Sequence, residues 1–98
     1  MGGGENNNIS GIKWFANAWL ISGAMVKLIP DVPKVYAEIN NESIGVLRAG
    51  VSGTLGLNHG LLLPSGTYIA DWFSSDEWWV WSQSPGSGSV SAFWVEGL

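Results

Sequence analysis

Turn-forming residues divide this chain into short apolar runs, and that division constrains its fold more than any other feature. From residue 34 onward, runs of about four to eight residues rich in Val, Ile, Leu, Tyr and Trp are separated by NNES, PSG and PGSG. The turns recur at roughly 8–12-residue spacing, which is typical of a sandwich or barrel, and no stretch favours a helix over a strand. The sequence therefore predicts an all-β fold, a small antiparallel β-sandwich or jelly-roll-like barrel.

The start of the chain differs in composition and predicts an extended N-terminal arm over residues 1–24, ahead of a β-sandwich domain over residues 25–98. MGGGENNN is rich in Gly and Asn, so we expect a partner to order it. In ISGIKWFANAWLISGAMVKLI a helix is conceivable, but Ile, Val and Trp together with Gly11 and Gly23 favour two short strands around SGA. We expect the arm to lie across a neighbouring subunit.

Alternation along the later runs groups side chains by face, because successive residues of a strand point to opposite sides. Apolar sides are formed by Val35, Ala37 and Ile39 in KVYAEI and by Val90, Ala92 and Trp94 in SVSAFWVE. The second of these is apolar throughout and should face the core. In EWWVWSQS both sides are apolar, Trp78 with Val80 and Trp79 with Trp81. One of them can fill the core, and the other needs a second cover such as another subunit.

Charge and hydropathy argue against two classes of partner. Charged residues are only 12% of the chain, the formal net charge is −4, and the basic residues are scattered. Nucleic-acid binding needs a clustered basic face, so we expect none. The run WFANAWLISGAMVKLI is shorter than the roughly 20 apolar residues of a membrane-spanning helix, and Asn, Ser, Gly and Lys interrupt it. We expect a soluble, unprocessed chain with no nucleic-acid and no membrane partner.

No pattern of side chains predicts catalysis. The chain has one histidine, His59, no cysteine, and no GxSxG element. SPGSGS lacks the lysine and the following helix of a phosphate loop, which favours a hairpin loop. Asp71, Asp76 and Glu77 could ligate calcium, but a solvated acidic turn is the favoured interpretation. We therefore expect a non-enzymatic protein without a cofactor or a metal.

The seven tryptophans exceed what a 98-residue core readily encloses. Their rings could pack the core, meet another subunit, or stack on sugars. A sugar platform would need coplanar exposed rings among Trp72, Trp78, Trp79 and Trp81, beside partners such as Asp71, Asp76 or Gln83. We favour core packing combined with an interface, because so few charged residues would keep exposed rings soluble. The predicted interface residues are Trp14, Phe15, Trp19, Trp72, Trp79, Trp81 and Phe93.

The order of segments from Lys27 to Leu98 resembles that of small β-sandwich virion proteins of tailed bacteriophages. The matching pieces are VKLIPDVPKVYAEINNES, IGVLRAG, LNHGLLLPSGTYIAD and EWWVWSQSPGSGSVSAFWVEGL. They follow that family's order of an apolar strand, a Pro-containing break, strands ending in Asn and Gly, a turn resembling LxPG, and a final hairpin. The match covers about the last three-quarters of the chain. WWVW departs from the smaller residues expected there, and the arm has no counterpart.

The resemblance implies a structural role in a virion. The implied function is a capsid decoration or cement protein on the capsid surface, which stabilises the phage head by multivalent protein contacts. The implied partners are further copies of the chain, as a homo-oligomer and by family tendency a trimer, and the major capsid protein or another virion protein. A tail or neck accessory protein is an alternative. A small carbohydrate-binding module that uses exposed tryptophans is another.

Overall fold

The computed structural model describes residues 12–21, 23–51, 53–56, 59–82 and 87–97. This part of the chain contains eight strands and no helix. The strands are β1 (Ile12–Ile21), β2 (Met25–Ile29), β3 (Lys34–Asn41), β4 (Leu47–Gly50), β5 (Leu61–Leu63), β6 (Tyr68–Ser74), β7 (Trp78–Ser82) and β8 (Ser87–Glu96). The predicted all-β class is confirmed.

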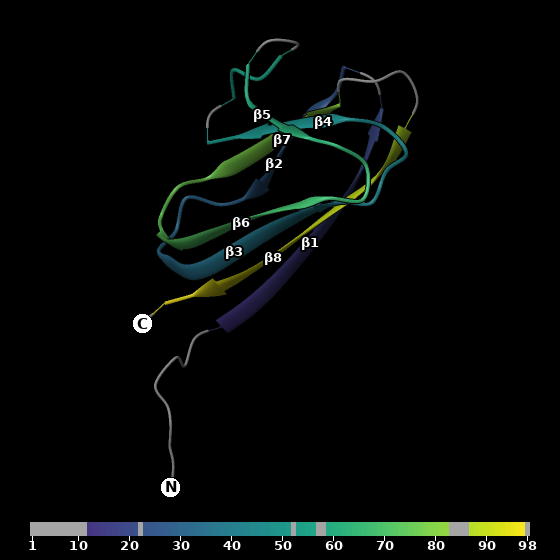
Figure 1. Ribbon diagram of the computed structural model, residues 1–98. Coiled ribbons are helices and arrows are strands. Elements are labelled where there is room, and N and C mark those ends of the chain that lie inside the picture. Colours follow the sequence, from purple (N-terminus) through teal and green to yellow (C-terminus); the bar gives the residue numbers. More distant parts are fainter. Residues whose placement is uncertain (1–11, 22, 52, 57–58, 83–86, 98) are drawn as a thin grey trace, which may run out of the picture.

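The strands form two four-stranded sheets that lie one over the other (Figure 1). Sheet A has the strand order β1-β8-β3-β6, and sheet B has the order β2-β7-β4-β5. Every pair of neighbouring strands is antiparallel. The inner sides of the two sheets supply the side chains that fill the space between them. This arrangement confirms the predicted small antiparallel β-sandwich.

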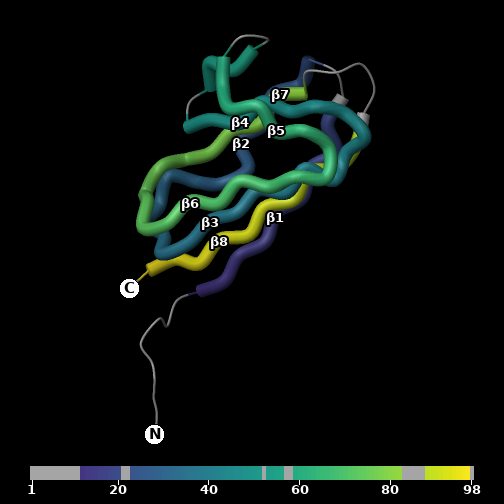
Figure 2. The backbone as a smooth tube through the Cα atoms, viewed as in Figure 1, coloured from purple at the N-terminus to yellow at the C-terminus, as the bar shows by residue number. Residues whose placement is uncertain are grey.

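Consecutive strands β1 and β2 lie in different sheets, as the tube view shows (Figure 2). The corner between them contains Gly23, whose φ of 82° is a left-handed conformation that glycine adopts readily. Backbone bonds fasten this corner to the end of β7, from Gly23 N–H to Ser82 O at 3.0 Å and from Ser82 N–H to Ala24 O at 3.1 Å. The prediction of two strands around SGA is confirmed.

The predicted arm over residues 1–24 includes one strand of the sandwich. Residues 12–21 are β1, which pairs with β8 along all ten of its residues. Leu20 is fully buried, and Ala18 packs against the core. The regular alternation of small or aliphatic residues with outward residues makes this segment a sheet strand and not a free arm. Residues 1–11 lie outside the described residues, so for them an arm across a neighbouring subunit stays a prediction.

The core lies between the sheets and is made of aliphatic and aromatic side chains from both. Its buried members are Leu20, Leu28, Ile29, Ala37, Ile39, Leu47, Ala49, Leu63, Trp78, Val80, Val90, Ala92 and Trp94. The predicted core side of β8 is therefore confirmed, and Trp78 with Val80 is the inward side of β7. Each large side chain buried in this way contributes about 1.5–3 kcal/mol to folding.

One buried amide ties the end of sheet A to sheet B. Asn41, at the end of β3, donates from Nδ2 to Leu63 O at 2.8 Å and to Gly45 O at 2.9 Å. Its Oδ1 accepts bonds from the Ser43 backbone N–H at 2.9 Å and from the Ser43 hydroxyl at 2.6 Å. Gly88 of β8 lies so close to Ser43 that a Cβ there would overlap it. The bond from Asn41 to Leu63 joins the end of β3 to sheet B, and the contact of Gly88 with Ser43 packs β8 against the turn that follows β3.

The start of β3 departs from simple alternation. The pairing of β3 with β8 shifts between Lys34 and Tyr36, which is a β-bulge or similar irregularity. As a result Val35 is only half-buried, whereas the Lys34 side chain is buried and donates from Nζ to Val32 O at 2.6 Å and Pro30 O at 3.1 Å. Burial lowers the pKa of the Lys34 ammonium below its ordinary value, despite nearby carboxylates.

Candidate functional site

The outer face of sheet A carries side chains that alternate with the core residues of its four strands. Antiparallel partners point to the same side, so the strand registers arrange these side chains in rows across the sheet. One row is Lys13, Val95, Tyr36 and Trp72; the next is Phe15, Phe93, Glu38 and Ala70; the third is Asn17, Ser91, Asn40 and Tyr68. Trp19 stands opposite Ser89 in a fourth row. Together these residues form the outer face of sheet A.

Aromatic rings form a continuous line across this face from β1 to β6. Phe15 and Phe93 have centroids 5.0 Å apart, and Phe93 lies 6.0 Å from Tyr36. Tyr36 in turn meets Trp72 edge-on, with centroids 4.5 Å apart and an angle of 62°. Phe15 is 72% exposed and Trp72 is 62% exposed. The line is therefore large, apolar and open to solvent, the usual condition of a surface that binds another molecule.

Two further exposed groups extend the apolar surface at its ends. Trp19 on β1 is 70% exposed. Phe73, next to Trp72 with ring centroids 6.3 Å apart, has a φ of 53° and is 76% exposed. A left-handed conformation is uncommon for a bulky residue such as Phe73. The backbone of β6 is therefore irregular next to its last residue, Ser74.

A polar cluster lies beside the aromatic line. Tyr36 donates its hydroxyl to Glu38 Oε1 at 2.5 Å, and Asn40 donates from Nδ2 to Glu38 Oε2 at 2.9 Å. These two bonds stabilise the ionised carboxylate and lower the pKa of Glu38. The same bond to Glu38, with burial second, raises the pKa of Tyr36 to about 12. The cluster therefore holds one carboxylate in a fixed position on an otherwise neutral part of the face.

Between the rings and the polar cluster the surface is hollowed. A shallow groove of about 370 Å³ runs over β1, β8 and β3. Its lining includes Phe15, Asn17, Glu38, Asn40, Ser91 and Phe93. Hydrogen-bonding groups and flat rings thus share one open groove. The rows that form it join the first strand to the last, so only the sheet register could reveal it.

The outer face of sheet B uses its tryptophans differently. Trp79 donates from Nε1 to Glu77 Oε2 at 2.6 Å, and the Lys27 ammonium lies 6.0 Å from its ring centroid and 3.6 Å from Glu77 Oε1. A Cβ on Gly53 would contact the Trp79 ring at 3.5 Å, so the backbone there lies against the ring. Trp81 lies between Met25 and Arg48 in the register. Both rings are half-buried within this one chain.

The seven predicted interface residues are therefore distributed over three places. Phe15, Trp19, Trp72 and Phe93 lie on the outer face of sheet A. Trp79 and Trp81 lie on the outer face of sheet B. Trp14 points toward the inner side of β1, where it stacks on Trp94 with centroids 6.5 Å apart and remains 44% exposed. Only the residues on the outer face of sheet A lie among further exposed rings, which are those of Tyr68 and Phe73.

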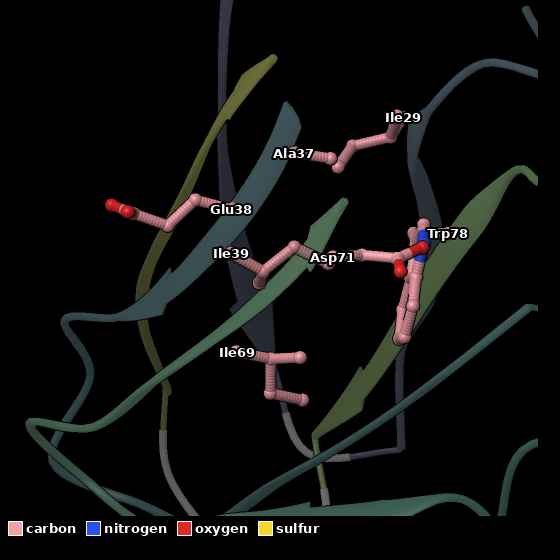
Figure 3. Close-up of a pocket in the computed structure, with 7 residues that line it drawn as sticks. All are labelled: Ile29, Ala37, Glu38, Ile39, Ile69, Asp71 and Trp78. Atoms are coloured by element: carbon pink, nitrogen blue, oxygen red, sulfur yellow. The ribbon is translucent and has the colours of Figure 1, made fainter. Parts of the chain in front are cut away.

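The alternative of a sugar platform formed by Trp72, Trp78, Trp79 and Trp81 is not supported by their positions. Trp78 is buried in the core, and its Nε1 has no hydrogen-bond partner within the described residues. Figure 3 shows Asp71 pointing toward this indole, across a gap that has no room for water, while Glu38 points to the other side of the sheet. Trp79 and Trp81 belong to a different sheet from Trp72. Gln83 lies outside the described residues.

Among the described residues, no group of three or more His, Cys, Asp or Glu side chains could hold a metal ion. The carboxylates considered for calcium have different neighbours: Glu77 binds Lys27 and Trp79, whereas Asp71 faces Trp78. His59 is exposed and joins Gly56 through two backbone hydrogen bonds. No described helix has the length and apolar character needed to cross a membrane.

Comparison of the chain with protein-family models, with curated proteins and with solved structures finds no match.

Proposed function

We propose that this chain is a non-enzymatic structural protein of a virion, a capsid decoration or cement protein that adheres through the outer face of sheet A. The observation that carries the proposal is the exposed aromatic line from Phe15 to Trp72, which has no cover within the described residues. The segment order shared with small phage virion proteins supports the location on a virion. A tail or neck position would use the same face.

The mechanism is adhesion by apolar burial. Exposed aromatic side chains that become covered at an interface each contribute about 1.5–3 kcal/mol, and aromatic residues dominate the binding energy of many interfaces. The face carries few charges, which are Lys13 and Glu38 in the three rows from Lys13 to Tyr68. Contact with a capsid protein therefore requires little desolvation of charged groups. Several copies bound side by side would hold neighbouring capsid subunits together.

The proposal is tested by measuring whether the chain co-sediments with virus particles. Particles are isolated from cultures in which the chain is naturally made, washed in high salt, and separated on a density gradient. We expect the chain to co-sediment and to resist salt, because apolar contacts are not screened as charge pairs are. Added Phe15→Ser and Trp72→Ser variants should bind stripped particles at least about tenfold more weakly than the unaltered chain. A chain found only at the top of the gradient would contradict the proposal.

A second candidate function is glycan binding in the groove of the same face. The observation that favours it is the combination of flat rings, Phe15 and Phe93, with Asn17, Asn40 and Ser91 along one groove. A glycan array distinguishes the two functions. Binding that is lost in Asn40→Ala, with particle attachment unchanged, would favour the glycan. Attachment without any glycan hit would favour the decoration role.

A further inference from the structure

The outer edge of β1 has properties that the other sheet edges lack. β1 is the edge strand of sheet A, and β8 is its only partner among the described residues. Its pairing with β8 runs through ten consecutive residues without a register shift. An edge strand of this length extends for about 33 Å and presents unpaired backbone donors and acceptors along its free side.

The other three edges are shorter or irregular. β5 has three residues and β2 has five, and the pairing of β2 shifts between Lys27 and Ile29. β6 includes Phe73 in a left-handed conformation, which ends regular extended geometry. Proteins protect edges with short strands, bulges, prolines and charges. β1 has none of these except Lys13 near one end.

We infer that β1 pairs antiparallel with β1 of a second copy, about a two-fold axis at Asn17, so that two A sheets form one continuous eight-stranded sheet. In a symmetric antiparallel pair the residue at the axis faces its own copy, and outward residues face outward residues. The axis at Asn17 places Phe15 opposite Trp19 of the second copy, twice. Both rings are more than two-thirds exposed in the single chain, at 72% and 70%.

Symmetry favours a second copy of β1 over the β6 edge as the partner, and charge does not oppose this pairing. Lys13 is the only charged residue of β1, so this register brings no two like charges face to face. Pairing of β1 with the β6 edge would be head-to-tail and would not close, whereas the β1–β1 pair is closed. The second copy also continues the aromatic rows of the outer face of sheet A beyond its edge. This inference goes beyond the proposed function, because it concerns the free edge of sheet A and not its outer face.

The axis position allows a direct cross-linking test, because the chain has no cysteine. Residues facing each other in an antiparallel pair have Cβ atoms about 4.5–5.5 Å apart, and modest adjustment brings them within disulfide range. Asn17 is exposed, so its side chain can be replaced without loss of core packing. Asn17→Cys should give a disulfide-linked dimer under mild oxidation. The matched control, Ala70→Cys on the exposed opposite edge of the same sheet, should stay monomeric on denaturing gels.

Charge exchange at the axis tests the same pair without a covalent bond. Asn17→Asp and Asn17→Lys each place like charges opposite each other and should raise the dimer dissociation constant by roughly tenfold or more. An equimolar mixture of the two variants should recover the dimer, and a misfolded variant could not do this. Light scattering coupled to size exclusion measures each sample. A monomeric unaltered chain, or a dimer that both substitutions leave unchanged, overturns the inference.

Co-sedimentation with particles, measured on the same samples, separates this inference from the proposed function. A monomer that still attaches to particles overturns the β1 pairing and leaves the decoration role standing. A dimer that responds to the Asn17 substitutions but never attaches keeps the pairing and contradicts the decoration role.

Discussion

On the outer face of sheet B, Trp79 is enclosed by a lysine, a carboxylate and the backbone near Gly53, whereas rings of similar size on the outer face of sheet A are open to solvent. Both faces belong to four-stranded sheets with the same antiparallel pairing. The difference lies in what the neighbouring segments supply. Sheet B supplies covering groups for Trp79 within the chain, whereas the described part of sheet A leaves Phe15, Trp19 and Trp72 largely exposed.

This contrast separates two uses of an aromatic residue. A ring that is covered within the chain contributes to folding, because its apolar area is already removed from water. A ring that is left open contributes little to folding until another molecule covers it, and until then it is a risk for aggregation. Substitutions on the two faces should therefore affect different measurements, stability for sheet B and association for sheet A.

The largest expected difference is in the stability of Trp79→Ala. The substitution removes a half-buried ring, the bond from its Nε1 to Glu77, and the contact of the ring with the Lys27 ammonium. We expect the free energy of unfolding to fall by about 2 kcal/mol, below the range for fully buried tryptophan. Urea denaturation followed by circular dichroism measures it. An equal loss in Trp19→Ala on the outer face of sheet A would break the contrast.

An intermediate effect is expected from the polar cluster on the outer face of sheet A. Tyr36→Phe removes the donor to Glu38, at a cost of about 1 kcal/mol near neutral pH, because the acceptor is charged but partly solvated. The bond links folding to pH in two directions. The Glu38 pKa is lowered by folding, so this stability is present above the ordinary carboxyl pKa and is lost as pH falls through the folded value.

The tyrosine side of the same bond acts at high pH. The pKa of Tyr36 is raised from 10.0 to about 12, so its contribution is complete below 10 and is lost as pH rises through about 12. Denaturant midpoints measured across pH should show both losses in the unaltered chain. In Tyr36→Phe the loss at high pH should be absent, and the loss at low pH should be smaller, because the bond from Asn40 to Glu38 remains. Ultraviolet absorbance of the phenolate gives an independent reading. A Tyr36 phenolate that forms near pH 10 would show that the bond to Glu38 is absent in solution.

The smallest effect on stability is expected at Trp19. Trp19→Ser removes a ring that is 70% exposed, so the free energy of unfolding of the single chain should change by less than about 0.5 kcal/mol. The same substitution should reduce the dependence of the melting temperature on protein concentration, if the ring meets a second copy. Melting curves at two concentrations provide the measurement. Strong destabilisation at low protein concentration would show that the Trp19 ring is covered within the single chain, as Trp79 is.

The fold could be predicted from the sequence because turns and alternation are local signals. Val90, Ala92 and Trp94 were assigned to the core from a single strand, and they are buried there. Alternation failed at Val35, because the register shift beside it depends on how β3 pairs with β8, far along the chain. The place of residues 12–21 in sheet A was not predicted, for a related reason. The partner of β1 is the last strand, and no local pattern indicates that pairing.

The candidate site was predictable only in part. Phe15, Trp72 and Phe93 were named from their residue types, and the registers bring them to one face. Trp79 and Trp81 were named on the same grounds, but the structure places them on the opposite sheet. Tyr36, Glu38 and Asn40 were missed as site residues. Their spacing of two along one strand was the available signal, since it places all three on one side.

The pairing of β1 with β8 also governs the order of events during synthesis. The first described strand finds its place in the sheet only when the last one is available, and the central strand β3 needs β8 as well. On the ribosome the β3–β6 and β4–β5 pairs can form first, whereas β1 waits for β8 and β2 waits for β7. Such long sequence separations slow folding, and they expose edges to neighbouring nascent chains. Chains translated close together on one message could then exchange last strands, so the rate of synthesis itself would influence how much protein reaches its native pairing.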